Sequence, residues 1–189
     1  MKRLFAVIFS VLILTAPYSL SIAAGGKLYR ASNLWYEYDR AGKIKPIPSI
    51  NYKKGIIIPA GTQVKDVTVT EGRRGSMVID FVISKGGKKY AIHYQPKYHT
   101  GIDVEVYKKR LFTPKSFEAL TKGFTKSEMK GVKNGKVTAG MRKKAVLVTY
   151  GYAPEHRTES IKSNVWLYWL DRFRTRKVAF NDKGVVVSE

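Results

Sequence analysis

The segment FTKSEMKGVKNG, residues 124–135, contains the clearest local signal in the chain. The Thr125 hydroxyl can accept a backbone N–H of the first helical turn, while the Glu128 carboxylate reaches back to the backbone of Thr125. This reciprocal arrangement is a capping box. Asn134 and Gly135 are typical of the end of a helix. The segment therefore predicts a short helix that begins at Thr125 and ends at Gly135.

The next segment, TAGMRKKAVLVTYG, residues 138–151, predicts a second helix that begins near Thr138. Apolar residues recur along it at the i, i+4 and i+7 spacing of one helix face: Met141, Ala145 and Val148. Gly151 ends this helix, and Pro154 follows within three residues.

Further elements flank these two helices. Thr113 can cap an earlier helix that has Pro114 at its first position and ends at Gly123. Beyond residue 151 the pattern changes to strands, with alternate residues facing one way: Trp166, Tyr168 and Leu170. Residues 181–184 predict a hairpin turn. We therefore expect residues 113–189 to form a helix–helix–three-strand domain.

Residues 25–112 have the two-residue alternation of β-strands. The segments that show it are 56–58, 64–69, 77–83, 90–94 and 102–106. Several short strands separated by turn signals predict a small antiparallel barrel or sandwich, for which an SH3-like barrel is one form. The fold class predicted for the whole chain is therefore α+β, with one domain in residues 25–112 and another in residues 113–189.

The N-terminal segment has the layout of a secretory signal peptide. Lys2 and Arg3 precede an apolar run over residues 4–16, and small residues before Gly25 suit cleavage. An uncleaved membrane anchor is the alternative, but a membrane span needs about 20 apolar residues. We expect residues 1–24 to be removed and the mature chain to be a soluble periplasmic or secreted protein without a transmembrane span.

Charge and cysteine content narrow the classes of partner. The chain has 189 residues, a net charge of +21 and no cysteine. The absence of cysteine excludes a disulfide scaffold, thiolate-bound zinc, a thiol nucleophile and a cysteine-linked lipid anchor. Removal of residues 1–24 leaves +19, with +10 in residues 25–112 and +9 in residues 113–189. This charge favours polyanions, and for an exported protein we expect envelope or outer-membrane proteins or an anionic lipid surface rather than nucleic acid.

The second half resembles a known family. GMRKKAVL at residues 140–147, YGYAP at 150–154, WLY at 166–168 and VAF at 178–180 with GVV at 184–186 are similar to the SmpA/OmlA (BamE-like) domain of small outer-membrane assembly lipoproteins. The resemblance covers about residues 124–188. It implies two helices packed on a three-stranded antiparallel sheet, and an interaction module as the function.

Three features depart from the family pattern. Arg142 stands where the family usually has threonine, no lipobox cysteine precedes the domain, and a β-rich domain comes before it. The same fold also occurs in secreted enzyme inhibitors that use the sheet as a docking surface. The resemblance therefore implies binding without naming the partner.

Candidate catalytic and metal-binding residues are few. His93 and His99 lie six residues apart near Asp103 and Glu105, but this spacing is not that of a closed metal site. His156 follows Pro154 in a predicted surface loop beside Glu155 and Arg157. The nucleophile-elbow, zinc-protease and phosphate-loop motifs are absent from the sequence. We expect no catalytic residue, no metal and no cofactor.

The best candidate binding residues are arginines near the C-terminus. In one extended strand, Arg172, Arg174 and Arg176 would project from the same face at a spacing suited to successive phosphates or carboxylates. Lys177 and Arg142 could widen this patch. The alternative is a solvated strand whose charges prevent edge pairing.

These observations predict a non-catalytic, exported cell-envelope protein that acts as an interaction or assembly module. Two alternatives stay open: a binder of an anionic envelope ligand (phospholipid, lipopolysaccharide or wall polymer) through the arginine strand, and a hydrolase whose site has no recognised motif.

Overall fold

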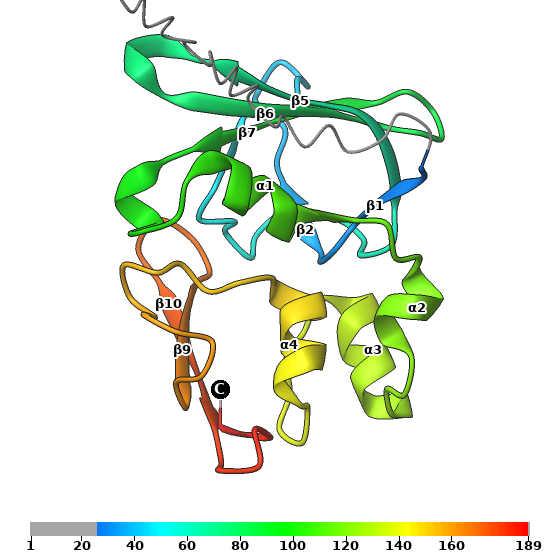
Figure 1. Ribbon diagram of the computed structural model, residues 1–189, viewed down its shortest axis with the longest axis vertical. Coiled ribbons are helices and arrows are strands. Elements are labelled where there is room, and N and C mark those ends of the chain that lie inside the picture. Colours follow the sequence, from blue (N-terminus) through cyan, green and yellow to red (C-terminus); the bar gives the residue numbers. More distant parts are fainter. Residues whose placement is uncertain (1–25, 189) are drawn as a thin grey trace, which may run out of the picture.

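The computed structural model describes residues 26–188 (Figure 1). The predicted signal peptide, residues 1–24, lies outside the described residues. The protein is a mixed α+β structure, as the sequence predicts, with a curled six-stranded sheet, two smaller antiparallel sheets and four α-helices in the described part of the chain.

The six-stranded sheet belongs to the first half. Its strands in spatial order are β3 (Ile47–Pro48), β7 (Lys89–Tyr94), β6 (Met77–Ile83), β5 (Gln63–Glu71), β1 (Leu28–Arg30) and β8 (Phe112–Thr113). Neighbouring strands are antiparallel except β3 and β7. Alternate residues of β6 and β7, such as Ile79, Phe81 and Ile92, are fully buried in one core. The period-two pattern therefore predicted these strands correctly.

Shorter elements complete this half. They are a two-stranded sheet of β2 (Leu34–Tyr36) and β4 (Ile56–Ile58), and two 3-10 helices at Arg73–Gly75 and Pro96–Tyr98.

The strand predicted over residues 102–106 is wrong, because α1 (Val104–Leu111) is a helix. The Asp103 carboxylate accepts the backbone N–H of Val106 at 2.7 Å and so caps the helix. Its first turn carries an acidic residue and its last turn carries basic ones, both favourable to the helix dipole. Tyr107 and Leu111, four residues apart, are buried in the core of the curled sheet.

The helix predicted over residues 113–123 is shorter than expected. It is α2 (Phe117–Thr121), and Ser116 caps it in place of Thr113 by accepting the N–H of Ala119. Thr113 is the last residue of β8, where it pairs with Tyr29 of β1. The backbone of Thr113 therefore belongs to the sheet and cannot begin the helix.

The second half consists of α3 (Lys126–Asn134) and α4 (Lys143–Tyr150), followed by β9 (Val165–Trp169), β10 (Thr175–Phe180) and β11 (Val186–Ser188). These strands form an antiparallel sheet in the order β11–β10–β9. The capping box of Thr125 and Glu128 is present, and Gly135 ends α3 in the left-handed region at φ 61°. Both predictions for this helix are confirmed.

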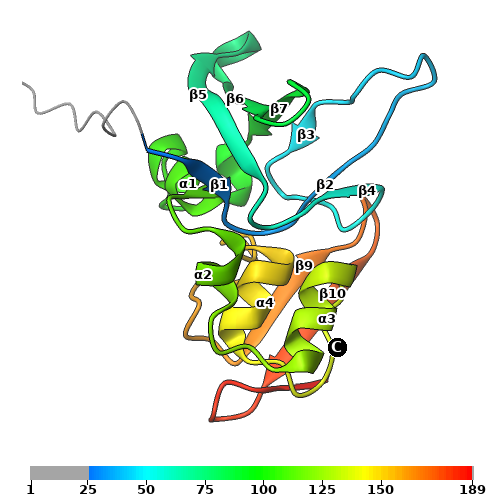
Figure 2. The ribbon, with the colours of Figure 1, turned by 90° about the vertical axis from the view of Figure 1, so that its right-hand side faces the viewer.

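The helix α4 begins at Lys143 and not near Thr138. The Gly140 N–H donates to the carbonyl of Val186 at 2.8 Å, and the Val186 N–H donates to the carbonyl of Met141 at 2.9 Å. These bonds hold the chain before α4 extended along β11. Figure 2 shows α3 and α4 lying against one face of β9 and β10. Trp166, Tyr168 and Val178 of that face form the second core together with Met141 and residues of α4.

The two halves are in direct contact. The Asn33 side chain donates to the carbonyl of Val132 at 2.8 Å, and the backbone N–H of Asn33 donates to the carbonyl of Val148 at 3.1 Å. Trp35 of β2 is buried in the core of the second half. Between residues 26 and 188 there is no helix both long and apolar enough to cross a membrane.

Candidate functional site

The predicted strand of three arginines does not form. Arg172 and Arg174 lie in the turn between β9 and β10, and β10 begins only at Thr175. The turn is closed by Asp171, whose carboxylate accepts the backbone N–H groups of Phe173 and Arg174, each at 2.9 Å. An aspartate that accepts backbone N–H groups two and three residues ahead favours a turn over an extended strand.

The remaining members of the predicted patch point elsewhere. Arg176 shares the helix-facing side of β10 with Val178 and Phe180, and its guanidinium lies 3.2 Å from the Tyr150 hydroxyl. Lys177 is exposed on the opposite side of the strand. The backbone of Arg142 forms an antiparallel β-bridge with Val185, beyond the far end of β10. The Arg142 side chain binds Glu128. The structure thus brings together Arg172 and Arg174 alone.

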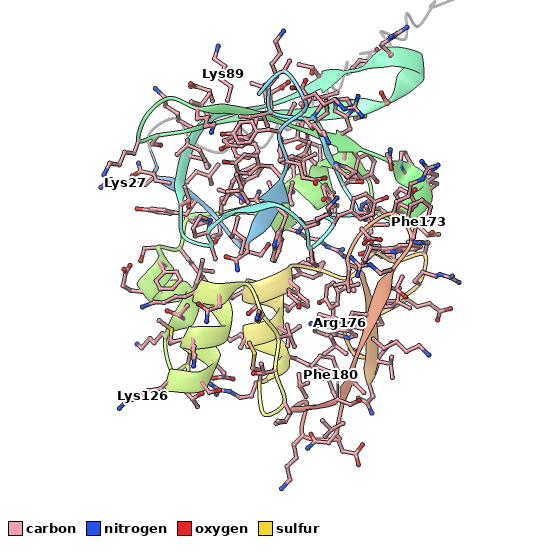
Figure 3. The ribbon with its side chains drawn as sticks, turned by 180° about the vertical axis from the view of Figure 1, so that it is seen from behind. Lys27, Lys89, Lys126, Phe173, Arg176 and Phe180 are labelled. Carbon is pink, nitrogen blue, oxygen red and sulfur yellow. The ribbon has the colours of Figure 1, made fainter. Side chains whose placement is uncertain are left out.

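The sequence analysis missed the residue between these two arginines. Phe173 is 85% exposed, the largest exposed fraction among the large apolar side chains described. Figure 3 shows Phe173 at the end of the hairpin and Arg176 further along β10. We call residues 171–174 the hairpin tip. An aromatic residue between two arginines, just after an aspartate that forms a turn, is the signal that could have revealed it.

The electrostatics of the hairpin tip follow from its hydrogen bonds. The backbone N–H of Phe173, the Arg174 side chain and the backbone N–H of Arg174 lower the pKa of Asp171 to about 2, so this carboxylate is ionised at neutral pH. Arg174 pairs with it at 2.6 Å but keeps 71% of its side chain exposed. Within residues 26–188 Arg172 forms no ion pair, and its guanidinium carbon lies 5.7 Å from the Phe173 ring centre.

Aromatic rings lie at the base of the hairpin. The rings of His156 and Trp169 are stacked with their centres 6.2 Å apart, and the Tyr98 ring lies tilted against His156 with the ring centres 5.1 Å apart. Burial raises the pKa of Tyr52, against the lowering influence of the Arg172 charge nearby. The hairpin tip therefore exposes two arginine side chains and one phenyl ring, and packed aromatic rings lie at its base.

The histidines considered for metal binding are separated. His93 is exposed on β7, whereas His99 is buried and its Nδ1 lies 2.9 Å from Glu155 Oε2. The other oxygen of Glu155 accepts from Arg110. Asp103 is occupied as a helix cap, and Glu105 pairs with Lys108. The described residues contain no group of three or more histidine, aspartate and glutamate side chains arranged to hold a metal.

The interaction of His99 with Glu155 joins residues 56 positions apart in the chain, so no local pattern predicts it. His99 Nε2 is buried and has no hydrogen-bond partner in the described structure. This histidine packs against the rings of Tyr94 and Tyr107, and its free nitrogen is closed off from solvent. The geometry is that of a buried packing contact rather than of an acid–base pair open to a substrate.

Searches for known relatives found no protein-family model, no curated protein and no solved structure that matches this chain.

Proposed function

We propose that this chain is a non-catalytic, exported envelope protein that binds an anionic lipid surface through its hairpin tip. Export rests on the predicted signal peptide, and the proposed location is the periplasm or the exterior, without a lipid anchor. The single observation that carries the binding proposal is Phe173, an almost fully exposed phenyl ring between two exposed arginines.

The chemistry of the hairpin tip matches the boundary between lipid headgroups and acyl chains. An aromatic ring gains free energy by leaving water for the apolar edge of the headgroup region, and guanidinium groups bind phosphates. Burial of one phenyl ring contributes about 1.5–3 kcal/mol, and each arginine near an anionic membrane contributes about 1 kcal/mol.

The sum, about 4 kcal/mol, corresponds to a dissociation constant of about 1 mM. Membrane binding by the hairpin tip alone is therefore weak. The long-range attraction between the basic chain and the anionic membrane supplies a second contribution. Because the mature chain carries a net charge of +19, its binding to an anionic surface weakens as salt rises.

Co-sedimentation with vesicles tests this proposal. The mature chain, residues 25–189, is mixed with vesicles of phosphatidylcholine alone or of phosphatidylcholine with phosphatidylglycerol, and the bound fraction is measured. The variants are Phe173→Ala and the double variant Arg172→Gln with Arg174→Gln. We expect the unchanged chain to bind only the anionic vesicles, and each variant to bind more than tenfold more weakly, since 1.4 kcal/mol is a factor of ten.

The matched control removes two charges at a different place. Lys126 and Lys130 are exposed on α3, and Figure 3 shows Lys126 far from Phe173. The double variant Lys126→Gln with Lys130→Gln has the same net charge as the arginine variant and leaves the hairpin tip intact. If the two double variants lose binding equally and Phe173→Ala loses none, general charge attraction accounts for the binding and the hairpin tip does not.

A protein-docking role on the outer sheet face is the second candidate, because β9 is apolar on both faces. Trp166 and Tyr168 face the core, while Val165 is 49% exposed on the opposite face, and Leu167 lies half-buried beside it. A sheet with one face covered by helices usually carries polar residues on the other face. The order α3–α4–β9–β10–β11 supports the BamE-like arrangement implied by the resemblance, whereas an SH3-like first half stays a prediction.

Site-specific crosslinking tests this second candidate. A photoreactive residue in place of Val165 should form a defined adduct with an envelope protein, and the same residue in place of the exposed Lys130 should not. Identical adducts from both positions, or none from Val165, would contradict a docking role for the sheet face.

A further inference from the structure

A cavity of about 330 Å³ lies where the two halves meet. Thr100, Ile102 and Arg110 line it from the first half, and residues 152–161 together with Trp166 supply most of the remaining wall. Its volume is at the lower end of the range for small-molecule sites, about 300–1,000 Å³. Contacts between two packed halves are a common place for such sites.

Two of the three charged side chains at this cavity, Arg110 and Glu155, neutralise each other. Arg110 donates to Glu155, and the second oxygen of Glu155 is bound to His99. The Arg110 guanidinium also lies 4.4 Å from the ring centre of Tyr152, which covers one of its faces. A guanidinium and a carboxylate that are bound to each other do not provide a net charge for an ionic ligand. The charge that remains is the carboxylate of Glu159, so the lining disfavours an anionic ligand.

The polar groups left over are suited to hydroxyl groups. The Thr158 Oγ1 accepts the backbone N–H of Leu167 at 2.9 Å, and the Ser160 Oγ accepts the N–H of Lys162 at 3.1 Å, which leaves each hydroxyl proton free to donate. The Glu159 carboxylate adds acceptor oxygens. The lining thus provides both donors and acceptors.

Apolar surface lies beside these groups. Tyr152 and Ile161 are both part of the cavity wall and are 38% and 49% exposed. A sugar ring presents hydroxyl groups around its edge and C–H groups on its faces, which is the pattern of this wall. From the cavity, its hydroxyl groups and its apolar wall we propose that it binds a neutral sugar residue. This site is separate from the hairpin tip and does not depend on lipid binding.

Saturation-transfer NMR on the full chain tests the proposal. The probes are glucose and N-acetylglucosamine as neutral sugars, with glucuronate and glucosamine as charged counterparts. We expect transfer to the neutral sugars, and a shift of the one indole N–H resonance that is missing in Trp166→Phe. No transfer to either neutral sugar, or stronger transfer to both charged sugars, would overturn the proposal.

Three variants distinguish sugar binding in the cavity from binding elsewhere on the surface. Ile161→Trp places a larger side chain in the wall, whereas Val187→Trp makes the same kind of change at a residue of β11 that is 57% exposed and outside the wall. Transfer should be lost in Ile161→Trp and kept in Val187→Trp. Glu159→Gln keeps the side-chain shape and should weaken binding severalfold, and equal binding by all three variants would place the sugar elsewhere.

Discussion

Arg142 binds Glu128 through both carboxylate oxygens. Its Nε donates to Oε1 at 2.8 Å, and a terminal nitrogen donates to Oε2 at 2.6 Å. The backbone N–H of Arg142 also donates to Oε1, and the backbone N–H of Thr125 donates to Oε2. The Glu128 carboxylate, which caps α3, therefore also binds Arg142, the residue immediately before α4. Arg142, which the sequence grouped with an anion-binding patch, is engaged in joining two helices.

This pairing predicts a loss of stability in acid. Hydrogen bonds from Arg142 lower the pKa of Glu128 to about 2, against an ordinary value of 4.5. A carboxylate with a lowered pKa in the folded state contributes its full stability above the ordinary value and loses it as the pH falls toward 2. The contribution is about 3 kcal/mol, since one pKa unit is about 1.4 kcal/mol.

Urea unfolding measured at several pH values between 2 and 7 checks this prediction. Glu128→Gln should be less stable than the unchanged chain at neutral pH and should lose less stability on acidification. Glu105→Gln is the control, because Glu105 pairs with Lys108 while 53% exposed. The same pH dependence in Glu128→Gln as in the unchanged chain would show that the pair contributes nothing.

Lys53 is predicted to stabilise the contact between the halves. Its ammonium donates to the carbonyl oxygens of Tyr150 at 2.7 Å and Asn51 at 2.8 Å, and it lies 4.8 Å from the Trp35 ring centre. Lys53→Met removes both hydrogen bonds from buried surroundings and should lower the free energy of unfolding by about 1–3 kcal/mol. Lys54→Met, which removes an exposed pair with Glu37, should change it by less than about 1 kcal/mol in thermal or urea unfolding.

Arg30 is predicted to be a destabilising residue. It is completely buried, its guanidinium has no hydrogen-bond partner in the described structure, and it lies against the rings of Phe81 and Phe112 at 5.6 and 5.0 Å. Burial lowers its pKa to about 10. Since ring contacts recover only part of the cost of burying a charge, Arg30→Met should raise the free energy of unfolding by about 1–3 kcal/mol.

The comparison variant for Arg30 is Arg110→Met. Arg110 donates to the largely buried Glu155, so removing it leaves a carboxylate short of a partner and should be destabilising. Urea midpoints should therefore move in opposite directions for the two variants. A lower midpoint for Arg30→Met would mean that its guanidinium has a stabilising contact after all.

Gly135 is predicted to tolerate no side chain. Its φ is 61°, and an added Cβ would lie 2.5 Å from Ile57 Cδ1 and 3.0 Å from the Trp35 ring. Gly140 also has a positive φ, but its added Cβ would meet nothing within 4 Å. Gly140→Ala should cost about 1–2 kcal/mol from backbone strain alone, and Gly135→Ala should cost clearly more. Equal urea midpoints for the two variants would argue against close packing of α3 on the first half.

Local rules succeeded wherever the deciding contacts lie within a few residues. Thr125 and Glu128 are three positions apart, so their capping box is visible in the sequence and is present in the structure. The alternation in residues 77–83 correctly predicted a strand. Asn181 accepts the backbone N–H of Lys183 and of Val185, which forms the predicted turn between β10 and β11.

The same rules failed where two local signals compete. Ile102, Val104 and Val106 alternate like a strand, but the Asp103 cap and the burial of Tyr107 against the curled sheet favour a helix. The spacing of Arg172, Arg174 and Arg176 resembles a strand face, but the backbone bonds to Asp171 place the first two in a turn.

The sequence by itself determined the α+β class, the position of α3, the strands of the curled sheet around residues 77–94 and the hairpin turn at 181–184. The tertiary structure decided the contact of His99 with Glu155, the cavity between the halves and the exposure of Phe173. The physical reason is the range of the interactions. Caps and turns form between neighbouring residues, whereas burial and pairing at these sites depend on segments that only the packing of both halves brings together.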